Sequence, residues 1–92
     1  PSDPAAGRSA VMGRRLPDGE PHFCDLKPGD YWKDQHGTWY AITPNDLHGN
    51  LRKHTITEHE DGTITVSPSI LVNQGSALTW HGYLERGVWR AC

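Results

Sequence analysis

Two pairs of adjacent aromatic residues, Tyr31-Trp32 and Trp39-Tyr40, constrain this chain more than any other feature. Both pairs lie in short stretches of β-branched and aromatic residues bounded by Gly-containing turns, which is the pattern of a β-hairpin. Neighbouring residues on a strand point to opposite faces of the sheet, so each pair places one ring on each face. A single sheet with one solvent-exposed face therefore leaves large aromatic rings exposed to solvent unless a second layer covers them.

Three segments show this hairpin pattern, each with a turn signal near its middle. They cover residues 30–43, 54–67 and 78–91, with turns predicted at 34–37, 60–62 and 85–87. We therefore expect a mainly β fold, in which three hairpins form a small antiparallel sheet that is curled or folded into a small sandwich. Pro68 cannot donate to a central ladder, so we expect a bend there. At most one short helix is expected: Leu47 and Leu51 are spaced for one helical turn, with an ordered loop as the alternative.

The apolar residues of the second hairpin predict its register. A two-residue loop at Asp61-Gly62 would leave Ile56 on the face opposite Val66, whereas a three-residue loop at 60–62 pairs these two side chains. A slip of one residue reverses every side chain, so the apolar face decides the register. We predict the three-residue loop, with its glycine in the left-handed conformation. The same turn is expected at residues 85–87.

Residues 1–22 differ in composition from the rest of the chain. They hold four of the seven Pro and no aromatic residue, and their charges cancel. Such a segment buries too little surface to offset the entropy of ordering it alone. We therefore expect an extended N-terminal arm over residues 1–22, held by its own domain, a second copy or a partner. Residues 23–92 are expected to form the β-rich domain.

Composition excludes several classes of protein. Nine Lys and Arg against eleven Asp and Glu give a net charge of −2. This balance argues against nucleic-acid binding, which requires a broad positive field. The longest apolar runs, such as Ile70-Leu71-Val72, are far too short to span a membrane. No recognisable secretory signal is present, because Arg14 and Arg15 are not followed by an apolar stretch.

Cysteine and histidine residues raise the question of a metal site. His22 and Cys24 are two residues apart and form the best local pair, but zinc needs three or four converging ligands. Cys24 as a nucleophile lacks a neighbouring helix N-terminus or cationic group that would activate its thiol. We therefore expect no catalytic residue, no cofactor and no metal ion. If a metal ion binds, His22 and Cys24 are the expected ligands. Whether Cys24 and Cys92 pair is left open.

Two longer stretches carry a resemblance to a known family. Residues 54–70 read HTITEHEDGTITVSPSI, and residues 80–89 read WHGYLERGVW. Over roughly residues 24–90 the chain resembles a family of small, uncharacterised proteins from actinobacteria and their bacteriophages. The resemblance implies a phage or prophage origin and no particular activity. Distant members carry a Cys before the Trp-His-Gly element, which implies metal binding in them, whereas this chain has Thr79 there and no Cys-x-x-Cys.

The number of large rings indicates a binding face, because Trp and Tyr dominate interface hot spots. The candidate partner-binding residues are Tyr31, Trp32, Trp39, Tyr40, Trp80, Tyr83 and Trp89. The alternative is that the arm or residues 44–53 cover the outer rings as a second layer.

We therefore expect a non-catalytic interaction module of phage type, acting in the host cytoplasm or the virion. It would bind a virion or host protein through its aromatic face and arm, or self-associate through residues 1–22. A small zinc-binding protein or metalloenzyme and a carbohydrate-binding module are the alternatives.

Overall fold

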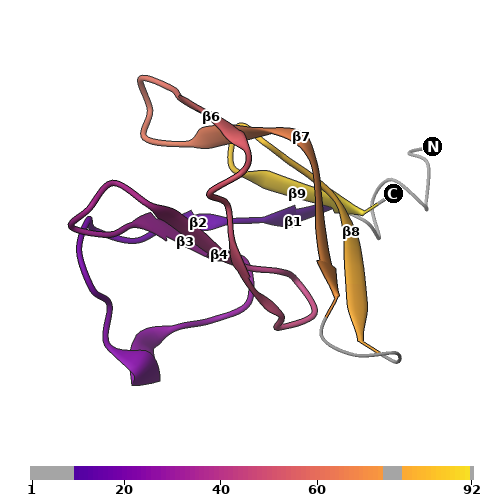
Figure 1. Cartoon of the computed structure of the whole chain (residues 1–92), viewed down its shortest axis with the longest axis horizontal. Helices are drawn as coiled ribbons and strands as arrows, with labels where there is room; N and C mark the ends of the chain where they lie inside the picture. Colours follow the sequence, from indigo (N-terminus) through magenta and orange to yellow (C-terminus); the bar gives the residue numbers. More distant parts are fainter. Residues whose placement is uncertain (1–9, 74–77, 92) are drawn as a thin grey trace.

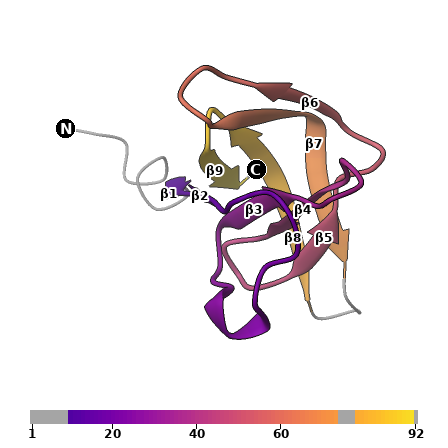
Figure 2. The same ribbon diagram turned by 90° about the vertical axis from the view of Figure 1, so that its left-hand side faces the viewer.

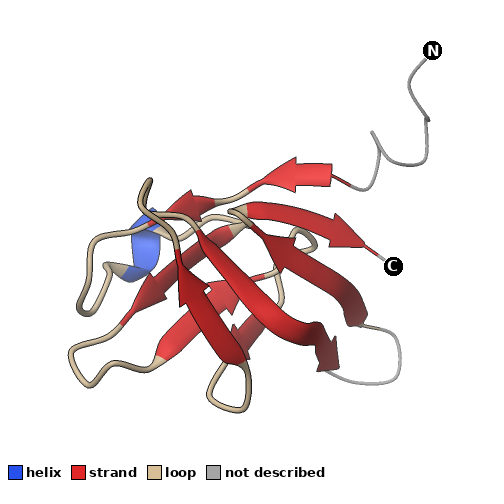
Figure 3. Ribbon diagram, turned by 90° about the horizontal axis from the view of Figure 1, so that it is seen from above, coloured by secondary structure: helices blue, strands red, loops and turns tan. Residues whose placement is uncertain are grey.

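Two β-sheets make up most of the computed structural model, which describes residues 10–73 and 78–91 (Figure 1). The five-stranded sheet has the order β1 (Ala10–Met12), β9 (Val88–Ala91), β8 (Thr79–Glu85), β7 (Ile64–Asn73), β6 (Thr55–Glu58). The four-stranded sheet has the order β2 (Arg14–Arg15), β3 (Asp30–Lys33), β4 (Trp39–Ile42), β5 (His48–Asn50). The one helical element in these ranges is a 3-10 turn at Phe23–Asp25 (η1), seen in blue in Figure 3. The expected mainly β fold is confirmed.

The segment predicted as an arm enters both sheets over its described part. β1 pairs antiparallel with β9, and β2 pairs parallel with β3, so one short stretch joins the two sheets. Gly13 lies at the crossing and donates its N–H to the Gly87 carbonyl at 2.7 Å. A Cβ atom at Gly13 would lie 2.8 Å from that oxygen, so the crossing requires glycine. Residue 22 therefore does not divide an arm from a body; residues 1–9 lie outside the described residues.

Two hairpin registers test the turn predictions. In the β6–β7 hairpin, Ile56 lies opposite Val66 and Gly62 has a φ of 89°, so the three-residue loop is confirmed. The β8–β9 hairpin differs from the prediction: Glu85 pairs directly with Val88, which leaves a two-residue turn. Both of its residues have positive φ, 48° at Arg86 and 78° at Gly87, as in the primed turns that match strand twist.

The helical turn considered for residues 44–53 is absent: residues 44–47 form an ordered turn, and β5 follows as a strand that the sequence did not predict. β5 pairs with β4 across a turn in which Thr43 Oγ1 accepts the Leu47 N–H at 2.9 Å. Asp46, with a φ of 68°, lets the chain reverse there. Leu47 and Leu51 are both buried in the core, so their four-residue spacing reflects packing at either end of a strand. The bend predicted at Pro68 is present as a register shift between Val66 and Ile70.

The aromatic pairs place rings in two separate cores. Tyr31 and Trp39 face the space between the sheets and join the main core. Their neighbours Trp32 and Tyr40 stack on the other face of the four-stranded sheet, with ring centroids 5.7 Å apart. A smaller cluster encloses them, and it includes Leu16 and Leu26 from the connection between β2 and β3. The second layer that the paired rings demand is therefore supplied by the chain itself.

Asp34 stabilises the β3–β4 turn, and this predicts a pH dependence. Its carboxylate accepts the N–H groups of His36 at 2.8 Å and Thr38 at 2.9 Å. The Thr38 bond is the largest cause that lowers the pKa of Asp34 below its ordinary 3.8. Because the unfolded chain holds this proton more tightly, the contribution is complete above about pH 5 and is lost as the pH falls below about 4.

We expect Asp34→Asn to be less stable than wild type at pH 7, with a difference that shrinks toward pH 2. Urea unfolding followed by circular dichroism across that range measures it. Asp61 has a lowered pKa through its bonds to Thr63, so some acid sensitivity remains in the variant. Parallel pH profiles for the two proteins would contradict this role of Asp34.

Candidate functional site

The predicted aromatic binding face does not form. Five of its seven members are buried: Tyr31, Trp32, Trp39, Trp80 and Trp89. Tyr40 is partly buried against Trp32, and Tyr83, at 44% exposure, is the one ring that faces solvent. The expectation failed for two reasons. The main core between the sheets encloses four of the rings, and Leu16 and Leu26 cover Trp32 on the other face of the four-stranded sheet. The same burial leaves no pair of exposed rings, among the described residues, for a sugar platform.

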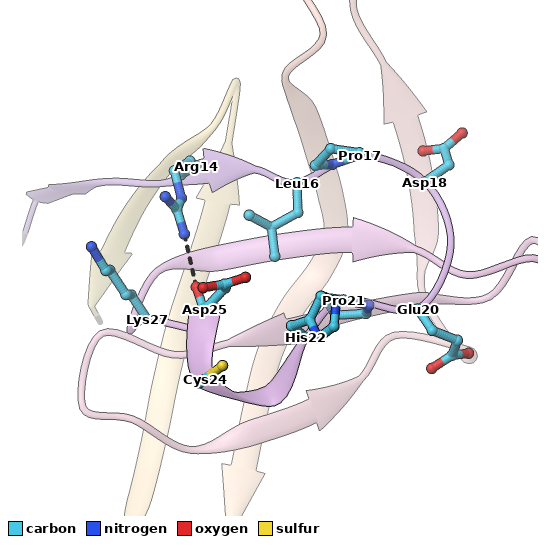
Figure 4. A pocket seen from close by; sticks show the side chains of 10 residues that line it. All are labelled: Arg14, Leu16, Pro17, Asp18, Glu20, Pro21, His22, Cys24, Asp25 and Lys27. Atoms are coloured by element: carbon cyan, nitrogen blue, oxygen red, sulfur yellow. Dashed lines mark hydrogen bonds between the residues drawn. The ribbon is translucent and has the colours of Figure 1, made fainter.

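His22 and Cys24 line one open groove of about 670 Å³, formed where the connection between β2 and β3 loops away from the sheet (Figures 1 and 4). Figure 4 shows Arg14 and Lys27 at one end of the groove, and Asp18 and Glu20 at the other. Arg14 is already engaged: its guanidinium binds both carboxylate oxygens of buried Asp30, at 2.8 and 3.0 Å. This bond to Asp30 is the main cause that raises the pKa of Arg14.

The groove does not assemble a metal centre from the residues described. His22 and Cys24 are both exposed, and no third histidine, cysteine or carboxylate joins them in a group that could hold a metal ion. Thr79, which stands where distant members of the resembling family carry Cys, offers no thiolate, so the residues present do not fit that implied metal. Cys92 lies outside the described residues, and Cys24 is a free thiol.

The outer face of the five-stranded sheet, the face turned away from the core, carries three exposed apolar side chains: Met12, Leu71 and Tyr83. Val11 lies opposite the inward-facing Trp89, at the edge of the core side. On β8, Trp80 and Leu84 point inward, so Tyr83 between them points outward. The exposed large apolar residues of the described chain all lie on or beside this sheet: Val11, Met12, Leu71, Leu78 and Tyr83. Figure 2 shows this sheet, with β7 and β8 in orange and yellow, beyond the four-stranded sheet. The four-stranded sheet has no such residue among those described.

An open cavity of about 590 Å³ lies on the same outer face. Its lining combines two arginines, a histidine and two threonines with one carboxylate and one valine: Thr57, His59, Thr65, Glu85, Arg86, Val88 and Arg90. Arg86 and His59 also line an adjoining cavity of about 500 Å³. No candidate residue predicted from the sequence lies in this site. The available signal was the Arg86-Gly87 pair, since a two-residue turn there would have aligned Arg90 with Tyr83 on the outer face.

Comparisons with protein-family models, curated proteins and solved structures find no match to this chain. Within residues 10–73 and 78–91, no helix is long and apolar enough to cross a membrane.

Proposed function

We propose that this chain is a non-catalytic protein-binding module that docks on its partner through the outer face of the five-stranded sheet. The observation that carries the proposal is the exposure of three apolar side chains, Met12, Leu71 and Tyr83, on the outer face. Met12 is 77% exposed and Leu71 is 62% exposed, although each belongs to a paired strand of that sheet. Apolar side chains gathered on one face are typical of protein interaction sites.

Tyr83 supports this proposal through its place on β8, between the two ends of the sheet. It lies opposite Arg90 on β9, while Leu71 on β7 lies opposite the next outward residue of β8, His81. A partner that covers Tyr83 therefore reaches both neighbouring strands. Tyrosine with arginine beside it is a combination enriched in interface hot spots. We propose a virion or host protein as the partner, following the resemblance to phage proteins.

Site-specific photo-crosslinking tests the proposal. A benzophenone amino acid is placed at Tyr83 or Leu71, with Gln35 in the β3–β4 turn as the control position on the other sheet. The expected result is one shared crosslinked protein from Tyr83 and Leu71 in phage-infected cells, and none from Gln35. A crosslinked dimer of this chain would identify a second copy as the partner and support the same face. Equal crosslinking from all three positions, or none from Tyr83 and Leu71, would contradict the proposal.

A further inference from the structure

Arg86 occupies a backbone position that its side chain makes unfavourable. It is the first residue of the two-residue β8–β9 turn and has a φ of 48°, in the left-handed region. Residues with a Cβ other than Asn and Asp rarely adopt this region, and Asn or Gly is the usual choice in such turns. An arginine at this position does not stabilise the turn. Non-glycine residues held in this conformation cluster at functional sites. The position of Arg86 therefore points to a function for its guanidinium group.

The two guanidinium groups of the outer-face cavity have no ion-pair partner among the residues described. Arg86 and Arg90 both line the cavity, and neither makes a salt bridge or side-chain hydrogen bond within the described chain. Arg14 and Arg15 by contrast are paired, with Asp30 for Arg14 and with Asp18 and Glu58 for Arg15. Two unpaired arginines in one cavity leave positive charge available for a ligand.

The nearby carboxylates only partly offset this charge. Glu58 is held by Arg15 at 3.2 Å and by Lys33 at 3.6 Å. Asp61 accepts both the N–H and the hydroxyl of Thr63, at 3.0 and 2.6 Å. Glu85 lines the cavity itself, and Glu60 lines the adjoining one. Inside the cavity the two arginines therefore face a single carboxylate.

The His59–Thr65 pair lines the cavity and retains one hydrogen-bond donor. Thr65 Oγ1 lies 2.7 Å from His59 Nε2 and accepts the Arg86 N–H at 3.0 Å. If His59 donates to Thr65, the threonine hydroxyl hydrogen remains for a ligand; if Thr65 donates, the His59 Nδ1–H remains. In both tautomers one polar hydrogen is left for an acceptor.

We propose that Arg86, Arg90 and the His59–Thr65 pair form a binding site for the phosphate group of a small phosphorylated ligand. Paired guanidinium groups with a neighbouring hydroxyl or imidazole donor match the acceptor oxygens of a phosphate. The cavity of about 590 Å³ has room for a ligand larger than the phosphate alone. This inference goes beyond the proposed protein partner: the cavity lies on the same outer face and includes Arg90, but none of the exposed apolar side chains lines it.

Titration with inorganic phosphate, followed by amide and side-chain NMR, tests the site at constant ionic strength against chloride and acetate. Saturable shifts at Thr65, Arg86 and Arg90 are expected with phosphate. Arg86→Asn and Arg90→Gln should each weaken this binding at least tenfold, the loss expected for one charge-assisted contact. Arg52→Gln, which removes an exposed arginine just beyond β5 on the other sheet, should leave it unchanged.

The Arg86→Asn variant separates binding from folding. Because asparagine tolerates the left-handed turn position, the variant should melt about 3 °C or more above wild type while losing phosphate binding. Phosphate shifts of wild-type size in Arg86→Asn would overturn the proposal, as would shifts of equal size with chloride or acetate. Loss of binding in Arg52→Gln would show that net charge alone attracts phosphate and would also overturn it.

Discussion

Replacing Trp89 with alanine is expected to lower the free energy of unfolding by about 3–5 kcal/mol, the range found for buried aromatic truncations. Trp89 is 0% exposed and packs edge-to-face with Trp80, with ring centroids 5.2 Å apart. Its indole Nε1 donates to the carbonyl of Gly29 at 2.9 Å, which ties β9 of one sheet to the start of β3 in the other. Urea unfolding monitored by circular dichroism measures the change.

The loss expected for Trp89→Ala approaches the whole free energy of unfolding of a small domain, so this variant can fail to fold. Two milder substitutions therefore complete the test. Trp89→Phe keeps a ring but removes the indole bond to the Gly29 carbonyl, which still accepts the Arg14 N–H at 3.3 Å. The expected cost is about 0.5–1.5 kcal/mol in hydrogen bonding beyond the lost ring volume. Trp80→Phe is the matched control, because its Nε1 has no hydrogen bond to any described residue. Equal losses in the two phenylalanine variants would show that the bond between the sheets contributes nothing.

The second large effect is expected at Gly82, where alanine should destabilise the fold by about 3 kcal/mol or more through overpacking. A Cβ atom there would overlap the Arg90 carbonyl oxygen on β9 and would lie 2.5 Å from the Trp80 ring. Both neighbours belong to packed strands, so β8 and β9 would have to separate. Thermal unfolding by differential scanning calorimetry measures the loss.

Gly37→Ala is the matched control for Gly82→Ala. Gly37 has a φ of 85°, and nothing lies within 4 Å of an added Cβ. The control therefore isolates the backbone conformation, which costs about 1–2 kcal/mol. A Gly82→Ala protein as stable as the Gly37→Ala protein would contradict the close approach of the two strands. The same approach explains physically why the Trp-His-Gly-Tyr-Leu element contains glycine.

The sequence was sufficient wherever one face of a strand had to be buried. The β6–β7 register was predictable because only one alignment gathers Ile56 with Val66 on the core side. The demand for a second layer was predictable from the Tyr31-Trp32 and Trp39-Tyr40 pairs alone. The β8–β9 turn was predicted wrongly, because a glycine follows both Asp61 and Arg86 and arginine seldom adopts positive φ.

Strand pairing between residues far apart in the sequence could not be predicted from the sequence. β2 runs parallel to β3, and the ion pair of Arg14 with Asp30 that accompanies this pairing joins residues with no local pattern between them. The phosphate site depends on the same kind of information, since the β6–β7 and β8–β9 hairpins must lie side by side before His59 meets Arg86. The aromatic face was mistaken because Leu16 and Leu26 carry no aromatic signal and yet enclose Trp32.

The pairing of β1 with β9 has a consequence for synthesis on the ribosome. Ala10 lies opposite Arg90, so the first described strand completes its sheet beside one that is translated about eighty residues later. A nascent chain can close the local hairpins as they emerge, but β1 has no partner until β9 has left the exit tunnel. Val11 and Met12 therefore have no partner strand until β9 has emerged, which makes the pairing of β1 with β9 a late step in folding.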